Sequence, residues 1–94
     1  MRVSFEPEAL ETLYDIAYFT NSINTDGAGQ FWITNFTLHL YSYAKPHMKY
    51  ALCNNKIFAE YGLSCISYNG WVAAFKIEDD ELIVHYIVRG NILV

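Results

Sequence analysis

The sequence predicts an α+β domain with elements in the order β-α-α-β-β-β, and three observations lead to this prediction. Two strand-like runs, residues 63–68 and 71–77, flank Asn69 and Gly70, a pair that favours a two-residue hairpin turn because both residues tolerate positive φ. A third run, residues 82–88, follows a second turn made of four acidic residues, which completes an antiparallel meander. Ahead of these strands, two segments carry apolar side chains at helical spacing.

A short strand and then a helix are expected at the start of the chain. Residues 2–5 alternate polar and apolar side chains, as a strand does. Glu6-Pro7-Glu8 then favours a helix start, because proline suits the first helical position and early acids suit the helix dipole. The helix is expected to end near Thr20. One apolar stripe of this helix is expected to face the core: Leu10, Leu13, Tyr14 and Ala17.

A second helix is expected from Gly27 to Tyr43, with Asp26 as its N-cap and Pro46 stopping it. Gly27 and Gly29 favour close packing between the two helices. Its predicted core side carries Trp32, Ile33, Phe36, Leu40 and Tyr43, and its opposite side carries Phe31, Leu38 and Tyr41. A helix that is apolar nearly all round is usually covered on both sides. We therefore expect the second side to bind an amphipathic helix of a partner, or a second copy of this chain.

The segment 45–61 has the least regular pattern, and a short strand or turn is expected around 48–52 and 57–59. Lys45 and Lys49 lie here among tyrosines, with His47 between them. Cations interleaved with aromatic rings suit contact with an anion such as a single-stranded nucleic acid. The equal alternative is that these lysines meet acidic residues of a partner protein.

Length and composition favour one domain over residues 1–94 that has more apolar material than a small core needs. The chain is 53% hydrophobic and 17% aromatic, and its formal charge is −4 with a pI of about 5.1. This charge argues against a free-standing nucleic-acid binder, which usually has the opposite sign. Residues 27–59 differ from the rest, because they contain three lysines and no acid. Surplus apolar surface on a small domain favours a permanent partner.

Cys53 and Cys65 are the two cysteines, and the sequence favours two reduced, packed thiols over a disulfide between them. This expectation rests on a cytoplasmic location, since the N-terminal residues contain no apolar stretch typical of a signal peptide and no uncharged run reaches membrane-spanning length with credible flanks. The spacing of cysteines and histidines matches no metal-binding motif, and no glycine-rich cofactor loop is present. Neither a metal nor a cofactor is expected.

Several stretches together resemble the RelE/ParE superfamily, the toxins of bacterial type II toxin–antitoxin pairs. The matching residues are Phe5-Glu6-Pro7-Glu8-Ala9, Gly62-Leu63, Gly70-Trp71-Val72, Phe75 to Val84, and Arg89-Gly90. The resemblance implies a helical hairpin packed on an antiparallel sheet and a cognate antitoxin that covers the active surface. It also implies one of two activities: ParE-like members poison DNA gyrase, and RelE-like members cleave mRNA on the ribosome.

Basic residues decide between these activities, because RNA cleavage needs cations that hold phosphate and stabilise the transition state. The strand at 64–68 has no basic residue, Trp71 and Val72 follow where RelE-like nucleases often carry arginine, and Arg89 is the one cation near the C-terminal end. The pattern therefore favours a non-enzymatic, ParE-like toxin. The alternatives are a ribosome-dependent ribonuclease and a degenerate, non-catalytic interaction module of the same fold.

His85 and Arg89 form the best candidate catalytic pair, with Tyr86 between them. A strand period of two is expected to place Ile83, His85, Ile87 and Arg89 on one face. An imidazole beside a guanidinium can act as a base and a phosphate clamp, and the ribonuclease alternative would add Lys49. The competing interpretation, which is the more common case, is a structural histidine hydrogen-bonded within the packing.

Overall fold

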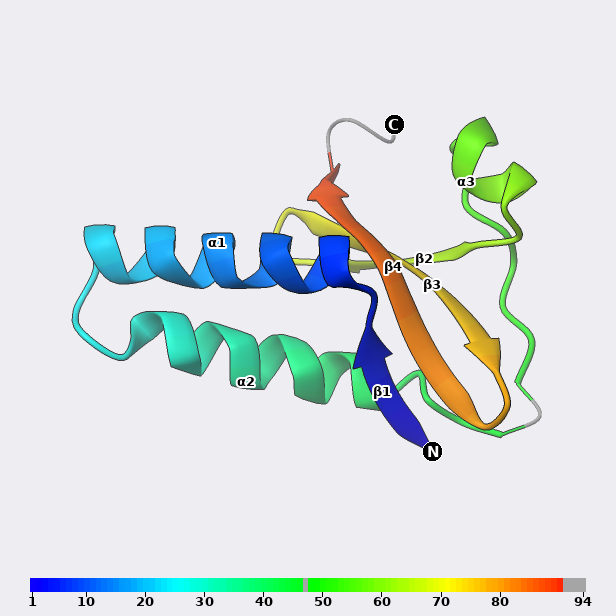
Figure 1. The fold of residues 1–94 in the computed structure, drawn as a ribbon, viewed down its shortest axis with the longest axis horizontal. Coiled ribbons are helices and arrows are strands. Elements are labelled where there is room, and N and C mark those ends of the chain that lie inside the picture. Colours follow the sequence, from blue (N-terminus) through cyan, green and yellow to red (C-terminus); the bar gives the residue numbers. More distant parts are fainter. Residues whose placement is uncertain (47, 91–94) are drawn as a thin grey trace.

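Two helices lie side by side and pack together against a four-stranded sheet (Figure 1), which confirms the predicted α+β class. The structure is a computed structural model, and it describes residues 1–46 and 48–90. Its elements are β1 (Arg2–Phe5), α1 (Pro7–Ile23), α2 (Ala28–Tyr41), α3 (Lys56–Glu60), β2 (Ser64–Tyr68), β3 (Trp71–Glu78) and β4 (Glu81–Arg89). The elements therefore follow the predicted order, with the short helix α3 added before β2.

The strand order is β1-β4-β3-β2, and three of the four strands form the predicted antiparallel meander. The first strand differs from the prediction, because β1 runs parallel to β4, so the sheet is mixed and not wholly antiparallel. The backbone N–H of Glu6 donates to the carbonyl of Val84 over 2.9 Å and extends this pairing. Val3 and Phe5 pack on the core, as their alternation predicts.

Both strand connections in the meander are two-residue turns, which confirms the predicted turn at Asn69 and Gly70 and the tight turn expected within residues 78–81. Asn69 and Gly70 have φ values of 47° and 82°, and Asp79 and Asp80 have φ values of 49° and 63°. Positive φ at both central positions is the mirror-image turn whose twist matches a hairpin. These turns set the pairing of Tyr68 with Trp71 and of Glu78 with Glu81.

We expect Gly70→Val to lower the free energy of unfolding by about 1–2 kcal/mol, because a β-branched residue resists positive φ. The cost arises in the backbone, since a Cβ at Gly70 meets no atom within 4 Å. Thermal or urea unfolding measures the loss, and Gly70→Asn is the matched control because asparagine tolerates this conformation. Equal stability of the valine variant and the parent would contradict the turn.

A β-bulge in β4 changes which residues share a face. Phe75 pairs with Val84 but Ala74 pairs with Tyr86, so His85 lies opposite no residue of β3. Ile87 is buried in the same cluster as Leu82 and Val84. The expected common face of Ile83, His85, Ile87 and Arg89 is therefore wrong, because the extra residue shifts the alternation by one.

The main core lies between the two helices and the sheet, and it tests the two predicted stripes. The stripe of α2 is confirmed: Phe36 and Leu40 are fully buried, and Trp32, Ile33 and Tyr43 pack against the core. The stripe of α1 is wrong at two positions, because Leu10 and Tyr14 are exposed while Ala9 and Ile16 are buried beside Leu13 and Ala17. The buried face of α1 therefore combines the small residues Ala9 and Ala17 with the larger Leu13 and Ile16.

The helices meet closely at Gly29. A Cβ on this residue would lie 2.3 Å from the carbonyl oxygen of Ala17, and its backbone N–H donates to Oδ1 of Asn21 over 2.7 Å. The packing role predicted for Gly29 is confirmed. Gly27 differs, since it has open space around it and serves as the N-cap of α2 with φ of 89°, the role that we expected for Asp26.

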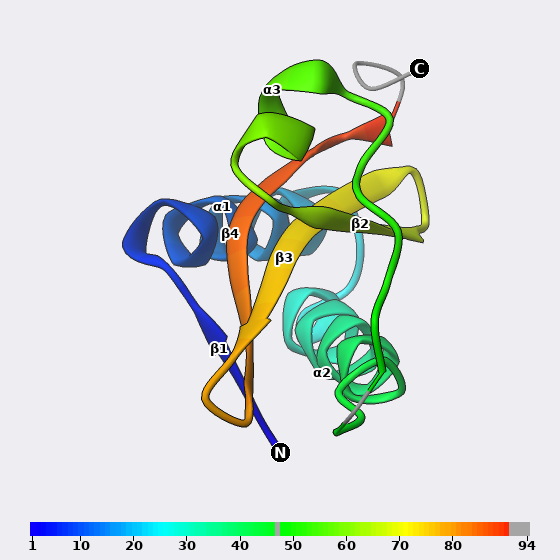
Figure 2. The same cartoon turned by 90° about the vertical axis from the view of Figure 1, so that its right-hand side faces the viewer.

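The segment before β2 contains a helical turn where a short strand or turn was expected at 57–59. Asn55 caps α3, because its Oδ1 accepts from the N–H groups of Ile57 and Phe58 at 3.0 and 3.1 Å. The described residues of 48–52 form no strand. They run beside β2 (Figure 2), where the hydroxyl of Ser64 donates to the carbonyl of Tyr50 over 3.3 Å.

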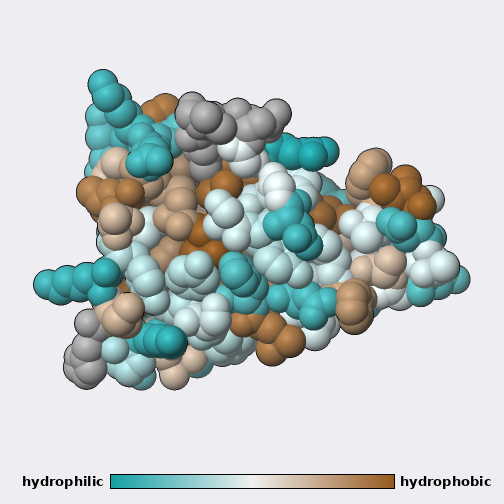
Figure 3. All heavy atoms as spheres, turned by 180° about the vertical axis from the view of Figure 1, so that it is seen from behind, coloured by the Kyte–Doolittle hydropathy of each residue, from teal (hydrophilic) through white to brown (hydrophobic). Residues whose placement is uncertain are grey.

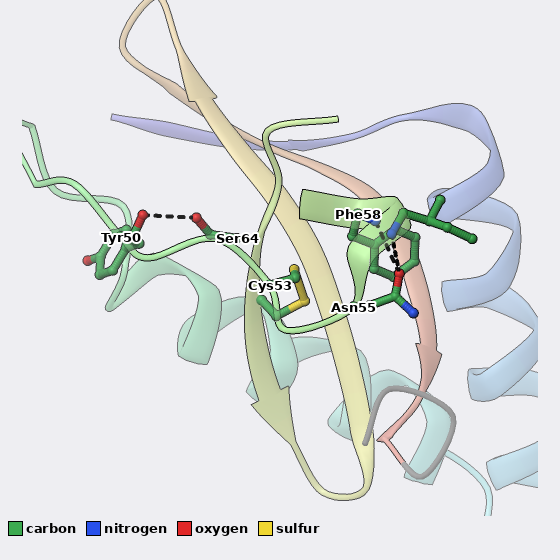
Figure 4. The surroundings of a disulfide bond; sticks show 7 residues. Tyr50, Cys53, Asn55, Phe58 and Ser64 are labelled. Carbon is green, nitrogen blue, oxygen red and sulfur yellow. Dashed lines mark hydrogen bonds between the residues drawn. A yellow bond between two sulfur atoms is a disulfide. The ribbon is translucent and has the colours of Figure 1, made fainter. Parts of the chain in front are cut away.

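Cys53 and Cys65 form a disulfide (Figure 4), so the expectation of two reduced thiols is wrong. Their Cα atoms lie 5.1 Å apart, a normal separation for a disulfide. The backbone N–H of Cys53 donates to the carbonyl of Leu63 over 2.9 Å, which brings the loop back beside the entry to β2. The sequence carried no sign of this contact, because it depends on how the α3 segment folds back.

Candidate functional site

His85 and Tyr86 line one open hollow of about 460 Å³, together with Glu6, Pro7 and Glu8 at the start of α1. The bulge accounts for this placement, because it lets two neighbouring residues of β4 border the same hollow. Nε2 of His85 is buried and has no hydrogen-bond partner in the described structure. The competing prediction was a structural histidine that is hydrogen-bonded within the packing. The unpaired Nε2 atom does not support it.

The electrostatics of this hollow do not suit a phosphate. Glu6 and Glu8 form part of its wall, and the described residues that line it include no lysine or arginine. Carboxylates repel an anion, so a phosphodiester in this hollow has a candidate base and no clamp. This hollow is therefore better suited to binding a neutral or cationic group than to binding and cleaving an RNA phosphodiester.

Arg89, the proposed clamp, lies in a different hollow of about 230 Å³ between α1 and the end of the sheet. Its guanidinium carbon is 4.8 Å from the centre of the Trp71 ring, a cation–π contact. Ile16 and Phe19 line the same hollow. The structure therefore joins His85 with Tyr86 and separates both from the hollow that holds Arg89.

Trp71 is a further residue of this region, and the sequence pattern did not indicate it as a partner for Arg89. A regular ladder from the turn at Asp79 and Asp80 would pair Trp71 with Val88, but the bulge moves the pairing to Arg89. The pairing of Trp71 with Arg89 depends on the extra residue in β4. No residue in β4 marks the bulge by type alone.

Lys45 and Lys49, the other predicted anion contacts, lie apart from both of these hollows. Lys49 lines a third hollow of about 330 Å³ with Tyr50, Ser64 and Lys76. Lys76 also forms a 3.4 Å ion pair with Glu78. Lys45 is exposed just after α2, and His47 lies outside the described residues. The predicted cations therefore do not converge on one anion site.

The predicted partner surface on α2 is exposed, which confirms its helical phase. Phe31, Leu38 and Tyr41 keep 72%, 62% and 47% of their surface accessible. On α1, Tyr14 and Tyr18 are exposed as well. Figure 3 shows several separate apolar patches on one face of the molecule, including the end of the helical hairpin that lies away from the sheet. Exposed apolar area of this extent is typical of a surface that binds another chain.

Side chains able to hold a metal ion do not gather anywhere in residues 1–46 and 48–90, which contain no group of three or more His, Cys, Asp or Glu placed for that purpose. No helix in the same part of the chain is both long enough and apolar enough to span a bilayer.

The fold resembles that of a solved structure described as the chromosomal ParDE TA system from P. aeruginosa. The two chains share 15% sequence identity, the match covers 95% of each, and the TM-score is 0.56. The present chain shares the fold of that ParDE component. At this identity the likeness concerns the fold alone. No protein-family model matches the sequence, and no curated protein matches it.

Proposed function

We propose that this chain is the toxin of a type II toxin–antitoxin pair, that it acts in a ParE-like manner by binding a cellular target, and that a cognate antitoxin neutralises it. One observation carries the proposal: the fold matches a ParDE component over 95% of both chains. The exposed apolar face of α2 supports it, because a permanent partner would cover that face. DNA gyrase is the proposed target, with the ribosome as the alternative.

The arrangement of side chains favours binding over RNA cleavage. His85 and Tyr86 border a hollow with Glu6 and Glu8, while Arg89 and Lys49 line two other hollows. A ribonuclease needs its base and its cations around one phosphate. Among the described residues, none of these three hollows joins the predicted base His85 to Arg89 or to a lysine, so we rank the RelE-like activity second.

The antitoxin is proposed to place an amphipathic helix along Phe31, Leu38 and Tyr41 of α2. Lys45 follows the end of this helix and is exposed. An acidic residue of the antitoxin near Lys45 would add a charge pair at the rim of the contact, where it aids orientation more than affinity.

Expression of the chain with and without the neighbouring reading frame tests the proposal. We expect growth arrest when the chain is expressed alone, and normal growth when a small neighbouring protein is co-expressed and co-purifies with it. Arrest of DNA replication with intact mRNA supports the ParE-like mechanism, and early mRNA cleavage supports the ribonuclease. Normal growth without the neighbour would favour a degenerate interaction module.

Arg89→Ala is expected to reduce this toxicity while the fold stays intact. The guanidinium stacks on Trp71 beside an apolar hollow, so it can present a charge to a target without rearrangement. Loss of the cation–π contact costs about 0.5–1 kcal/mol at an exposed site, which is too little to unfold the chain. Growth after induction measures toxicity and circular dichroism checks the fold. Arg89→Lys, the matched control, keeps the charge, and full toxicity of the alanine variant would leave Arg89 without a functional role.

A further inference from the structure

A second, small apolar cluster lies on the face of the sheet opposite α1 and α2. Cys53, Leu63 and Ala74 are buried in it, and Phe58 and Tyr86 pack against it. Ala74 faces this cluster while its neighbour Ala73 faces the main core, which places the two clusters on opposite faces of β3. Residues 54–62, which we name the α3 flap, cover this second face.

The α3 flap has few ties to the rest of the molecule. Helix α3 contributes no buried residue, and Ile57 and Tyr61 are about 60% and 61% exposed. In the described structure, every hydrogen bond of the flap joins it to a residue between 53 and 63. One aromatic contact reaches the sheet: Phe58 stacks on Tyr86 with ring centres 5.3 Å apart and planes 10° apart. Besides the backbone, which runs from Gly62 through Leu63 into β2, the disulfide between Cys53 and Cys65 covalently ties the base of the flap to a strand.

We propose that the Cys53–Cys65 disulfide is a redox latch that keeps the α3 flap closed over the outer face of the sheet. Cys65 is partly exposed on β2, whereas Cys53 is 7% exposed. A thiolate of a dithiol reductant attacks Sγ of Cys65, and the sulfur of Cys53 leaves and takes up a proton. The second thiol of the reductant then displaces Cys65. The protein gains two thiols, and the reductant becomes a disulfide.

Opening the latch changes the hollow that contains His85. Tyr86 connects the hollow to the flap, because it lines the hollow and also stacks on Phe58 of the flap. When the flap moves away, Tyr86 loses its stacking partner and the outer face around Ala74 becomes accessible. A reducing compartment therefore opens this face and an oxidising one closes it. The proposal concerns the chain's own conformation and does not depend on the proposed toxin function.

Limited trypsin digestion of the full chain with and without dithiothreitol tests the latch. Lys56 is the first residue of α3 and is exposed, so reduction is expected to speed cleavage there by roughly tenfold or more, since cleavage follows the population of the open state. Lys76 lies within the central strand β3, and cleavage there reports unfolding of the whole domain. The double variant Cys53→Ser/Cys65→Ser should be cleaved rapidly at Lys56 under both conditions.

Hydrogen exchange on the reduced parent protein keeps the test decisive if the double variant fails to fold. We expect faster exchange in residues 56–62 while amides of α1 and α2 keep their protection. Equal exchange in the flap before and after reduction would overturn the latch. Faster exchange in α1 and α2 together with the flap would also overturn it, because the disulfide would then hold the whole domain and not the flap.

Discussion

Gly29→Ala is expected to lower the free energy of unfolding by about 3 kcal/mol or more, the upper range for overpacking. The new Cβ would lie 2.3 Å from the carbonyl oxygen of Ala17 and 2.9 Å from its carbon. Both atoms belong to the backbone of α1, so the two helices must move apart. That movement also strains the 2.7 Å hydrogen bond from the Gly29 N–H to Asn21. A loss of this size lowers the melting temperature by roughly 12–24 °C for a domain of this length.

Gly27→Asn is the matched control for this substitution. Gly27 lies two residues away, a Cβ there would meet no atom within 4 Å, and asparagine tolerates its positive φ. We expect its stability to stay close to that of the parent. Melting curves followed by circular dichroism compare the two variants. A Gly29→Ala protein as stable as the control would mean that α1 and α2 pack less closely than described.

Leu38→Glu is expected to weaken association with the antitoxin by at least roughly 30-fold, which corresponds to about 2 kcal/mol. Leu38 is 62% exposed between Phe31 and Tyr41, so the substitution leaves the core untouched. On binding, the new carboxylate is buried without a partner, and an unpaired buried charge is costly. Co-purification and calorimetric titration with the neighbouring protein measure the effect, and circular dichroism checks the fold.

Asn54→Glu supplies the control for added charge, because residue 54 is exposed and lies in the loop before α3, outside the predicted partner surface. It should bind the antitoxin like the parent. If Leu38→Glu stays folded and also binds normally, the partner does not use this face of α2. The sheet edge or the part of the loop around Lys45 and Lys49 then becomes the next surface to mutate.

Local chemistry explains which parts of the fold were predictable from sequence. The turn at Asn69 and Gly70 and the acidic turn before β4 depend on backbone conformations that few residues tolerate. The core face of α2 was also predictable, because Phe36 and Leu40 are large and regularly spaced. The stripe of α1 was predictable only in part: Leu13 and Ala17 are buried as expected, but Ala9, whose small side chain gives a weak pattern, is buried while Leu10 and Tyr14 are exposed.

The candidate site was less predictable, because it depends on contacts between distant segments. One extra residue in β4 separates His85 from the face of Ile87 and pairs Trp71 with Arg89. The disulfide joins two cysteines whose spacing fits a reduced pair equally well. Residue types alone indicate which side chains could act in a site. Which of these side chains lie together depends on the register of the sheet and on the path of the α3 flap.

The parallel pairing of β1 with β4 has a consequence for how the chain assembles during synthesis. Arg2 of β1 pairs with Glu81 of β4, so β1 has no strand partner until β4 has left the ribosome. Helices α1 and α2 are neighbours in sequence and can pack earlier, because local contacts form faster than distant ones. Nascent chains that stop before Glu81 lack β4 and leave β1 unpaired. Such fragments expose helices without a completed sheet beneath them, which makes them targets for chaperones and proteases.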